Sequence, residues 1–225
     1  MEKRYEIKFS VNQNEMVEIL YFIKKNKFYR SYPSRYVNSL YFDTSDNISI
    51  SNNLAGLSNR HKIRLRWYEN NKIPPVLELK SRKDRIVYKQ KIDIDFLSVQ
   101  YINKNNLCKI RKEIFKFISN QKKFDLRLID FYFPNLLVNY KREYFELNKN
   151  IRLTIDKNIK FKNISLNKNV NYFKNVNYNQ IVAEIKFPIH LKDNVAELIR
   201  HLNLSPKRHS KYLVGMSKVA NLVYI

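Results

Sequence analysis

The chain has 225 residues, enough to bury a substantial core, and its 43 Lys and Arg against 20 Asp and Glu give a formal net charge of +23. This excess favours phosphate-bearing partners such as nucleotides, polyphosphate, nucleic acid or an anionic membrane surface. The chain has one Cys, which excludes an intrachain disulfide. The sequence has neither the apolar region of a signal peptide nor an apolar run of the roughly 20 residues needed to span a bilayer. We therefore expect a cytoplasmic protein without a membrane segment.

The charge total alone is weak support for a binding function. The chain is rich in Lys, Asn and Ile and has only two Gly, a bias that an AT-rich coding sequence produces without selection for binding. The placement of the charged residues is therefore more informative than their sum.

The N-terminal segment 4–11 alternates apolar and charged residues at the period of a β-strand, with Glu6 and Lys8 on the charged side. Asn12 and Glu15 then have the spacing of a helix capping box, and apolar residues at helical intervals follow them. Further on, 37–43 predicts a short strand.

Residues 60–95 contain three successive segments that each alternate apolar and charged side chains. Two arrangements satisfy this pattern. The simpler is an antiparallel meander with its apolar face on a core and its ionic face in water. The other is a closed barrel with helices packed outside, whose ionic faces line an internal tunnel that would bind a polyanion.

The rest of the chain continues the same alternation. Helices are predicted over 97–121, from Asp193 and from Ser210, strands over 137–147, 151–156 and 181–187, and an Asn- and Lys-rich loop over 157–180. No repeat, Gly-rich phosphate loop or domain boundary emerges, which predicts one domain over 1–225.

Several short motifs occur in the order seen in the VTC domain. They are RYEIKF from Arg4, SLYFDT from Ser39, RHKIRLRWY from Arg60 after the Gly56 turn, LELK from Leu77, YKQK from Tyr88, YKREYF from Tyr140, IRLTID from Ile151, AEIKF from Ala183 and SKY from Ser210. In these motifs the chain resembles the polyphosphate polymerases of the VTC domain family, within the CYTH or triphosphate tunnel metalloenzyme superfamily.

The resemblance implies a fold and a chemistry. The fold is α+β, with a closed antiparallel β tunnel barrel and helices packed outside, in a single VTC-like tunnel domain. The chemistry is metal-dependent phosphoryl transfer, in which Mn²⁺ or Mg²⁺ assists transfer of the terminal phosphate of ATP, or another nucleoside triphosphate, to inorganic polyphosphate.

The resemblance also implies roles for particular residues. Catalytic phosphate contacts fall on Lys8, Arg64, Arg66, Lys80, Lys89, Arg142, Arg152, Ser210 and Lys211; further contacts to the bound cofactor or substrate fall on Lys186, Lys91 and Glu78; and metal binding falls on Glu184 and Glu6. A single basic residue among these is equally compatible with a solvated surface charge, but repeated sharing of strand faces across separated segments favours one site. Other CYTH members begin with a Glu-x-Glu-x-Lys pattern, whereas Arg4, Glu6 and Lys8 occupy those places here, which favours the polymerase-like branch.

Two alternatives remain beside the polymerase. An inorganic triphosphatase or nucleoside triphosphatase would use the same tunnel with water as the acceptor, and a non-catalytic polyanion-binding module would need only the charge. The 16 Tyr and 14 Phe fall mostly on apolar faces, so no specific nucleic acid is expected, and the sequence carries no signal for an oligomeric state. His209 is the one His near the predicted site, without a defensible catalytic partner, and Lys122 and Lys123 are expected to be solvated charges.

Overall fold

The chain is an antiparallel sheet with helices packed on it, an α+β fold. The computed structural model describes residues 4–69, 73–83, 86–102, 104–119, 131–164 and 175–219. The strands are β1 (Arg4–Val11), β2 (Tyr29–Asp43), β3 (Arg60–Tyr68), β4 (Val76–Lys83), β5 (Ile86–Asp93), β6 (Phe133–Leu147), β7 (Ile151–Asn163), β8 (Asn175–Tyr178) and β9 (Ile181–Pro188). The helices are α1 (Met16–Lys25), α2 (Ile48–Leu54), α3 (Leu107–Ser119), α4 (Lys192–Ile199) and α5 (Lys211–Val219).

The strands follow the order β1-β9-β7-β6-β2-β3-β4-β5, with β8 paired to β7. The sequence predicted a closed barrel, and this was wrong for the described strands, whose order begins at β1 and ends at β5 without a pairing that joins those two. Period-two alternation specifies which face of a strand is apolar, but it does not specify which edge strands meet, so it could not distinguish an open sheet from a closed one.

Backbone contacts divide the chain into two compact units. Unit 1 comprises Met1–Tyr36, Asn139–Lys160 and Asn177–Lys211, and unit 2 comprises Val37–Val138, Phe161–Val176 and Tyr212–Ile225. The strands β2, β6 and β7 contribute residues to both units.

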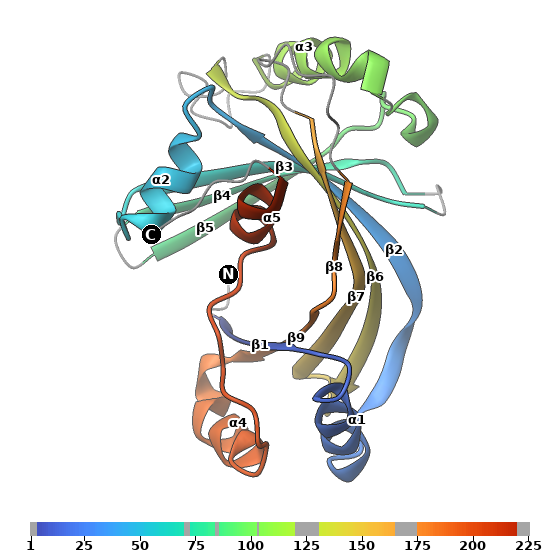
Figure 1. Cartoon of the computed structure of the whole chain (residues 1–225), viewed down its shortest axis with the longest axis vertical. Helices are drawn as coiled ribbons and strands as arrows, with labels where there is room; N and C mark the ends of the chain where they lie inside the picture. The colour runs from blue at the N-terminus through green and yellow to red at the C-terminus, as the bar shows by residue number, and fades with distance from the viewer. Residues whose placement is uncertain are drawn as a thin grey trace. The chain divides into compact units, whose positions relative to one another are not determined.

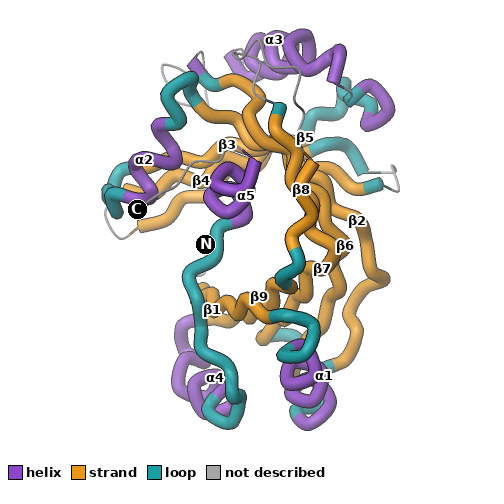
Figure 2. The backbone as a smooth tube through the Cα atoms, in the orientation of Figure 1, coloured by secondary structure: helices purple, strands orange, loops and turns teal. Residues whose placement is uncertain are grey.

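In unit 1 the apolar faces of β1 and β9 pack against α1 and α4, which lie beside these strands in Figure 2. Phe9 and Ile185 are almost completely buried in this core, together with Ile19 of α1 and Val195 of α4. Burial of each such side chain stabilises the fold by about 1.5–3 kcal/mol. The period-two alternation of β1 therefore places its charged residues on the face away from the helices.

The predicted capping box at the start of α1 is confirmed. The Asn12 backbone N–H donates to Glu15 Oε2 at 2.8 Å, and the Glu15 N–H donates to Asn12 Oδ1 at 2.9 Å. This reciprocal pair satisfies two backbone donors that a helix start would otherwise leave without partners. The helix begins at Met16 and buries one stripe of its surface.

In unit 2 the apolar faces of β3 and β4 pack against α3, whose side chains Ile110, Ile114 and Ile118 have no exposed surface. Figure 1 shows α3 on one side of β3, β4 and β5, with α5 on the other side. The ionic faces of these strands are therefore on the side away from α3.

Three predicted elements had wrong bounds. Residues 37–43 are the second half of β2, because its first half is exposed on both faces and contains Pro33, so it shows no alternation. The predicted loop 157–180 contains the end of β7, where Ile159 and Phe161 are buried, and β8. The predicted helix 97–121 is reduced to α3, preceded by short 3-10 turns. Among the residues that the structure describes, no helix has the length and apolar character that crossing a bilayer requires.

Candidate functional site

In unit 2, a buried carboxylate on β4 binds three basic side chains from adjacent strands. Glu78 accepts a hydrogen bond of 2.7 Å from Arg64 Nε through Oε2, while its Oε1 lies 3.4 Å from Arg66 Nη1 and 3.2 Å from Lys89 Nζ. We call Glu78, Arg64, Arg66 and Lys89 the Glu78 cluster. Strand pairing explains why these four side chains meet. Arg64 lies directly opposite Glu78, and all four side chains occupy the sheet face away from α3.

The Glu78 cluster carries a net positive charge around a fixed anion. Burial raises the pKa of Glu78, but Arg64, Arg66 and Lys89 outweigh burial and lower it to about 2. Burial, together with the two arginines, lowers the pKa of Lys89 to about 8 despite the attraction of Glu78. At neutral pH the cluster therefore holds one carboxylate and three cations.

Beside this cluster, lysines face one another across three strands. Lys62 of β3 is directly opposite Lys80 of β4, and Lys80 is directly opposite Lys89 of β5. Like charges in directly opposed positions destabilise a sheet, and a bound polyanion would offset that repulsion. The predicted site residues Arg64, Arg66, Lys80, Lys89 and Glu78 thus share one face, and Lys91 joins them opposite Glu78.

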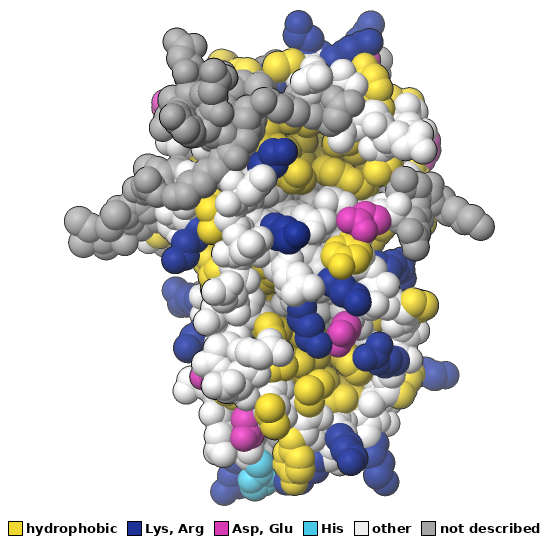
Figure 3. Space-filling view, turned by 45° about the vertical axis from the view of Figure 1, so that its right-hand side comes forward, with side chains coloured by type: hydrophobic (Ala, Val, Ile, Leu, Met, Phe, Trp, Pro, Cys, Tyr) yellow, Lys and Arg dark blue, Asp and Glu magenta, His cyan; other side chains and the backbone are white. Residues whose placement is uncertain are grey.

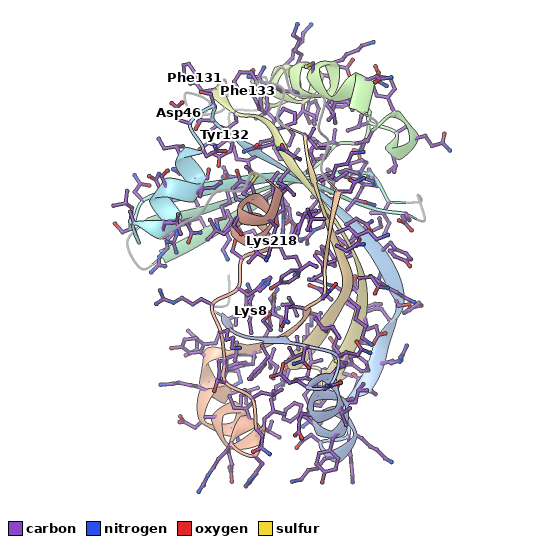
Figure 4. All side chains as sticks on the ribbon, viewed as in Figure 1. Lys8, Asp46, Phe131, Tyr132, Phe133 and Lys218 are labelled. Atoms are coloured by element: carbon purple, nitrogen blue, oxygen red, sulfur yellow. The ribbon has the colours of Figure 1, made fainter. Side chains whose placement is uncertain are left out.

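In unit 1, two carboxylates and two ammonium groups interleave on β1 and β9. Lys8 Nζ lies 2.6 Å from Glu6 Oε1 and 3.8 Å from Glu184 Oε2, and Lys186 forms ion pairs with both Glu6 and Glu184. We call these four residues the Glu184 cluster. Antiparallel pairing sets Glu6 opposite Lys186 and Lys8 opposite Glu184, and Figure 4 shows Lys8 projecting from β1.

Both carboxylates of the Glu184 cluster are ionised at neutral pH. Burial raises the pKa of Glu184, but Lys186, Lys8 and Arg142 outweigh it and lower that pKa to about 2. Burial and the Glu184 charge raise the pKa of Glu6, but Lys8 and Lys186 hold it below its usual value. Two negative charges are thus kept close together by the surrounding cations.

A third carboxylate, also in unit 1, binds two more predicted residues. Asp156 of β7 is fully buried and accepts two hydrogen bonds from Arg142, at 2.6 Å and 2.7 Å, and one from Lys211 Nζ at 2.6 Å. Burial raises its pKa, but Arg142 and Lys211 hold it well below the usual range for Asp. We call these three residues the Asp156 cluster.

The sequence matches the model of the VTC domain over residues 3–220. The chain belongs to the VTC domain family. No curated protein matches the sequence of this VTC domain.

Solved structures share the fold of this VTC domain at low sequence identity. The PH1819 protein of Pyrococcus horikoshii OT3 is 13% identical, with 96% of this chain and 99% of that chain covered and a TM-score of 0.54. HpAC1 of Hippeastrum, whose description gives it a dominant triphosphatase activity, is 16% identical, with 97% and 96% covered and a TM-score of 0.55.

The remaining predicted residues of the VTC domain are less constrained. Arg152 lies opposite Lys186 and its Nε is 2.9 Å from Glu146 Oε1, although its side chain is 53% exposed. Ser210 is half-buried in the segment that leads into Lys211 and α5. Lys122 and Lys123 lie outside the described residues.

His209 is a buried residue of the VTC domain next to the predicted site. Its backbone carbonyl accepts a hydrogen bond of 3.2 Å from Lys8 Nζ, and its Nε2 is 3.4 Å from the Tyr178 hydroxyl. Burial, with the charges of Lys211 and Lys8, lowers its pKa to about 4. The ring is therefore neutral at neutral pH.

Sequence reasoning missed some of the residues that organise these clusters. Asp156 was placed on the charged face of its strand, but nothing in the local sequence indicated that it joins Arg142 to Lys211. Tyr41 was also missed: its hydroxyl accepts a hydrogen bond of 3.1 Å from Arg64, and its ring stacks on Tyr212 at 5.0 Å. Register across strands would have identified both residues, because Tyr41 lies directly opposite Arg64 and Asp156 bonds to Arg142 of the adjacent strand.

The Glu184 cluster fits a divalent metal ion. Glu6 and Glu184 are two ionised carboxylates of adjacent strands, and both form ion pairs with Lys8 and Lys186. In the described parts of the chain, no group of three or more His, Cys, Asp or Glu side chains is suited to hold a metal. Mg²⁺ is commonly bound by one or two carboxylates together with substrate phosphates, which is the donor set that Glu6 and Glu184 provide.

Proposed function

We propose that this VTC domain transfers the terminal phosphoryl group of ATP, or of another nucleoside triphosphate, to inorganic polyphosphate. The observation that carries the proposal is the Glu78 cluster with its neighbouring lysines. In this cluster, the Glu78 carboxylate holds arginine and lysine side chains on one face of the sheet. The positively charged side chains outnumber the carboxylate, so the face is left with a net positive charge. Such an array suits a ligand that carries a negative charge on every phosphate.

Each cluster has a role in this proposal. Arginine presents a planar fork that binds two phosphate oxygens, and lysine supplies a mobile point charge. The proposed phosphate-binding residues of unit 2 are Arg64, Arg66, Lys80, Lys89 and Lys91. Those of unit 1 are Lys8, Arg142, Arg152, Lys186, Ser210 and Lys211. Glu78 and Asp156 position these cations and do not themselves contact the substrate.

Glu6 and Glu184 are the proposed ligands of Mn²⁺ or Mg²⁺. The bound ion would neutralise charge on phosphate oxygens in the transferring group. The ammonium groups of Lys8 and Lys186 keep both carboxylates ionised and available for that ion.

The proposed reaction needs no general base. The terminal phosphate of polyphosphate is already an oxyanion, so the protein has to position the two phosphates and neutralise their charge. His209 is neutral and bound to its neighbours, which is consistent with a role in packing.

A second candidate is a triphosphatase that uses water as the acceptor. The observation in its favour is that HpAC1, which shares this fold, is described with a dominant triphosphatase activity. Against it, Arg4 occupies a place where other CYTH members have a glutamate, which makes the start of β1 more basic.

The test is incubation of the chain with ATP and Mn²⁺ or Mg²⁺, followed by gel detection of polyphosphate and assay of free phosphate. Polyphosphate that lengthens with time supports the polymerase, and release of free phosphate without polymer supports the triphosphatase. No turnover with either metal overturns both and leaves a polyanion-binding module.

A matched pair of variants tests the metal ligand. Glu184→Gln removes the carboxylate charge at constant volume and should abolish most turnover with the fold intact by circular dichroism. Glu143→Gln is the control, because strand alternation places Glu143 on the other face, where it pairs with Lys157 at 3.2 Å. Equal activity in the two variants would refute the role of Glu184.

A further inference from the structure

The first half of β2, in unit 1, exposes three tyrosine rings. Tyr29, Tyr32 and Tyr36 are 47%, 53% and 39% exposed, whereas the aromatic side chains Phe9 and Phe187 of the same unit are almost completely buried. A tyrosine that is not packed in a core retains a free apolar surface on which another planar group can stack.

Tyr32 belongs to a compact group with two other side chains. Its ring centroid lies 5.9 Å from that of Tyr144, edge to face, and the Arg35 guanidinium lies 5.6 Å from the Tyr32 ring and 5.4 Å from the Tyr144 ring. We call Tyr32, Arg35 and Tyr144 the aromatic cluster. The guanidinium contacts both rings, and such contacts favour the orientations that the rings have in the structure.

Strand register places the aromatic cluster on the same face as the Glu184 cluster. In the β6–β7 hairpin, Arg142 pairs with Asp156 and Glu146 pairs with Arg152, so Tyr144 lies between them, opposite Thr154. Thr154 is in turn opposite Glu184. Tyr144 is therefore two strands, or about 10 Å, from the proposed metal ligand.

We propose that the aromatic cluster is a base-stacking subsite that binds the nucleobase of the nucleoside triphosphate. This rests on the proposed function, in which the triphosphate group lies at the Glu184 cluster. A separation of two strands is comparable with the distance between the phosphates and the base in an extended nucleotide. Aromatic rings and arginine both stack on the π face that every nucleobase presents, so the subsite selects nucleotides over inorganic triphosphate without reading the identity of the base.

The subsite predicts a difference between two substrates of the same domain. Tripolyphosphate has the phosphates but lacks the base, so only ATP can use the aromatic cluster. Tyr32→Leu and Arg35→Ala should each raise KM for ATP by about 5- to 100-fold and leave KM for tripolyphosphate within about twofold.

Two control variants match the chemistry of these changes. Tyr21→Leu alters a tyrosine of α1 that is 61% exposed, and Arg30→Ala removes a guanidinium that lies 5.6 Å from the Phe145 ring. Phe145 belongs to the apolar core, on the opposite face from Tyr144. Neither control should change KM for ATP or for tripolyphosphate.

Equilibrium binding of ATP and of tripolyphosphate, measured by calorimetry, provides a readout that does not depend on turnover. A weaker affinity for ATP alone in Tyr32→Leu supports the subsite, even if the wild-type chain turns over neither compound and the proposed function fails. Equal weakening for both ligands, or no weakening for either, overturns the subsite, because the cluster would then serve only to pack β2 on β6.

Discussion

At the scale of single residues, three carboxylates with lowered pKa values organise most of the basic side chains that the sequence pointed to. Glu78, Glu184 and Asp156 are each at most 6% exposed, and each lies against two or more cations. Breaking such a buried pair is more costly than losing a surface ion pair, since it leaves a charge without compensation. These acids therefore determine where the cations are held.

The pKa of Lys89 predicts an alkaline limit to phosphate binding. Burial and the two arginines lower this pKa to about 8, so Lys89 is charged below that pH and loses its charge above it. The value of kcat/KM for ATP should fall as the pH rises through about 8. Lys89→Arg keeps its charge at every accessible pH and should move this limb to higher pH. A pH profile that is identical in the two proteins would contradict the assignment.

Asp156 predicts a change in stability. Asp156→Asn leaves Arg142 and Lys211 facing each other without an anion and should lower the free energy of unfolding by about 3–5 kcal/mol. Urea denaturation followed by circular dichroism measures this change in the free energy of unfolding. The pKa of Asp156 is lower in the folded than in the unfolded state, so its contribution is complete above about pH 4 and is lost as the pH falls further.

The control for this stability change is Glu146→Gln, which breaks the pair with the largely exposed Arg152. Such a pair contributes about 0–1 kcal/mol. Similar losses in the two variants, or a loss from Asp156→Asn that persists unchanged at pH 3, would contradict the role given to Asp156.

At the scale of secondary structure, elements with one buried face were predictable and elements exposed on both faces were not. The capping box at Asn12 and the alternation in β1, β3 and β9 gave correct strands and a correct helix start, because one face of each strand is apolar and packs in a core. The first half of β2 has no buried face, so its sequence carries no periodicity, and the aromatic cluster there was missed for the same reason. The apolar and charged faces of a strand were thus predictable from the sequence. Contacts between side chains of different strands were not, because they depend on the register in which the strands pair.

Helix α5 depends on a close approach that only glycine allows. A Cβ added at Gly215 would lie 2.5 Å from Leu136 Cδ2 and 2.7 Å from Phe161 Cδ1, so Gly215→Ala must displace core side chains. Overpacking typically costs about 1–3 kcal/mol, and the better helix propensity of Ala offsets about 1 kcal/mol of it. We expect a net loss of stability in thermal denaturation. Lys218→Ala, on an exposed part of α5 (Figure 4), is the control and should change stability by less than about 0.5 kcal/mol.

At the scale of the whole molecule, a net charge of +23 has two possible meanings. It can act as a diffuse field that attracts any polyanion, or it can be effective only where cations are fixed on a sheet face. In the view of Figure 3, the Lys and Arg side chains are dispersed among acidic and apolar ones and form no single basic patch. On this face the cations are therefore not gathered into one field, and the two meanings can be separated by comparing variants of equal charge.

The Arg64→Ala/Arg66→Ala double variant removes two guanidinium groups of the Glu78 cluster, and Lys112→Ala/Lys116→Ala removes two exposed charges of α3. Both lower the net charge by the same amount within unit 2. A charge-assisted contact is worth about 1.5–3 kcal/mol, so the first variant should reduce the rate of ATP consumption by at least about tenfold, while the second should stay near the wild-type rate. Arg66→Lys should keep only part of the rate that Arg66→Ala loses, because lysine lacks the bidentate fork. Circular dichroism checks that each variant is folded, and an equal fall in the two double variants would mean that diffuse charge holds the phosphates.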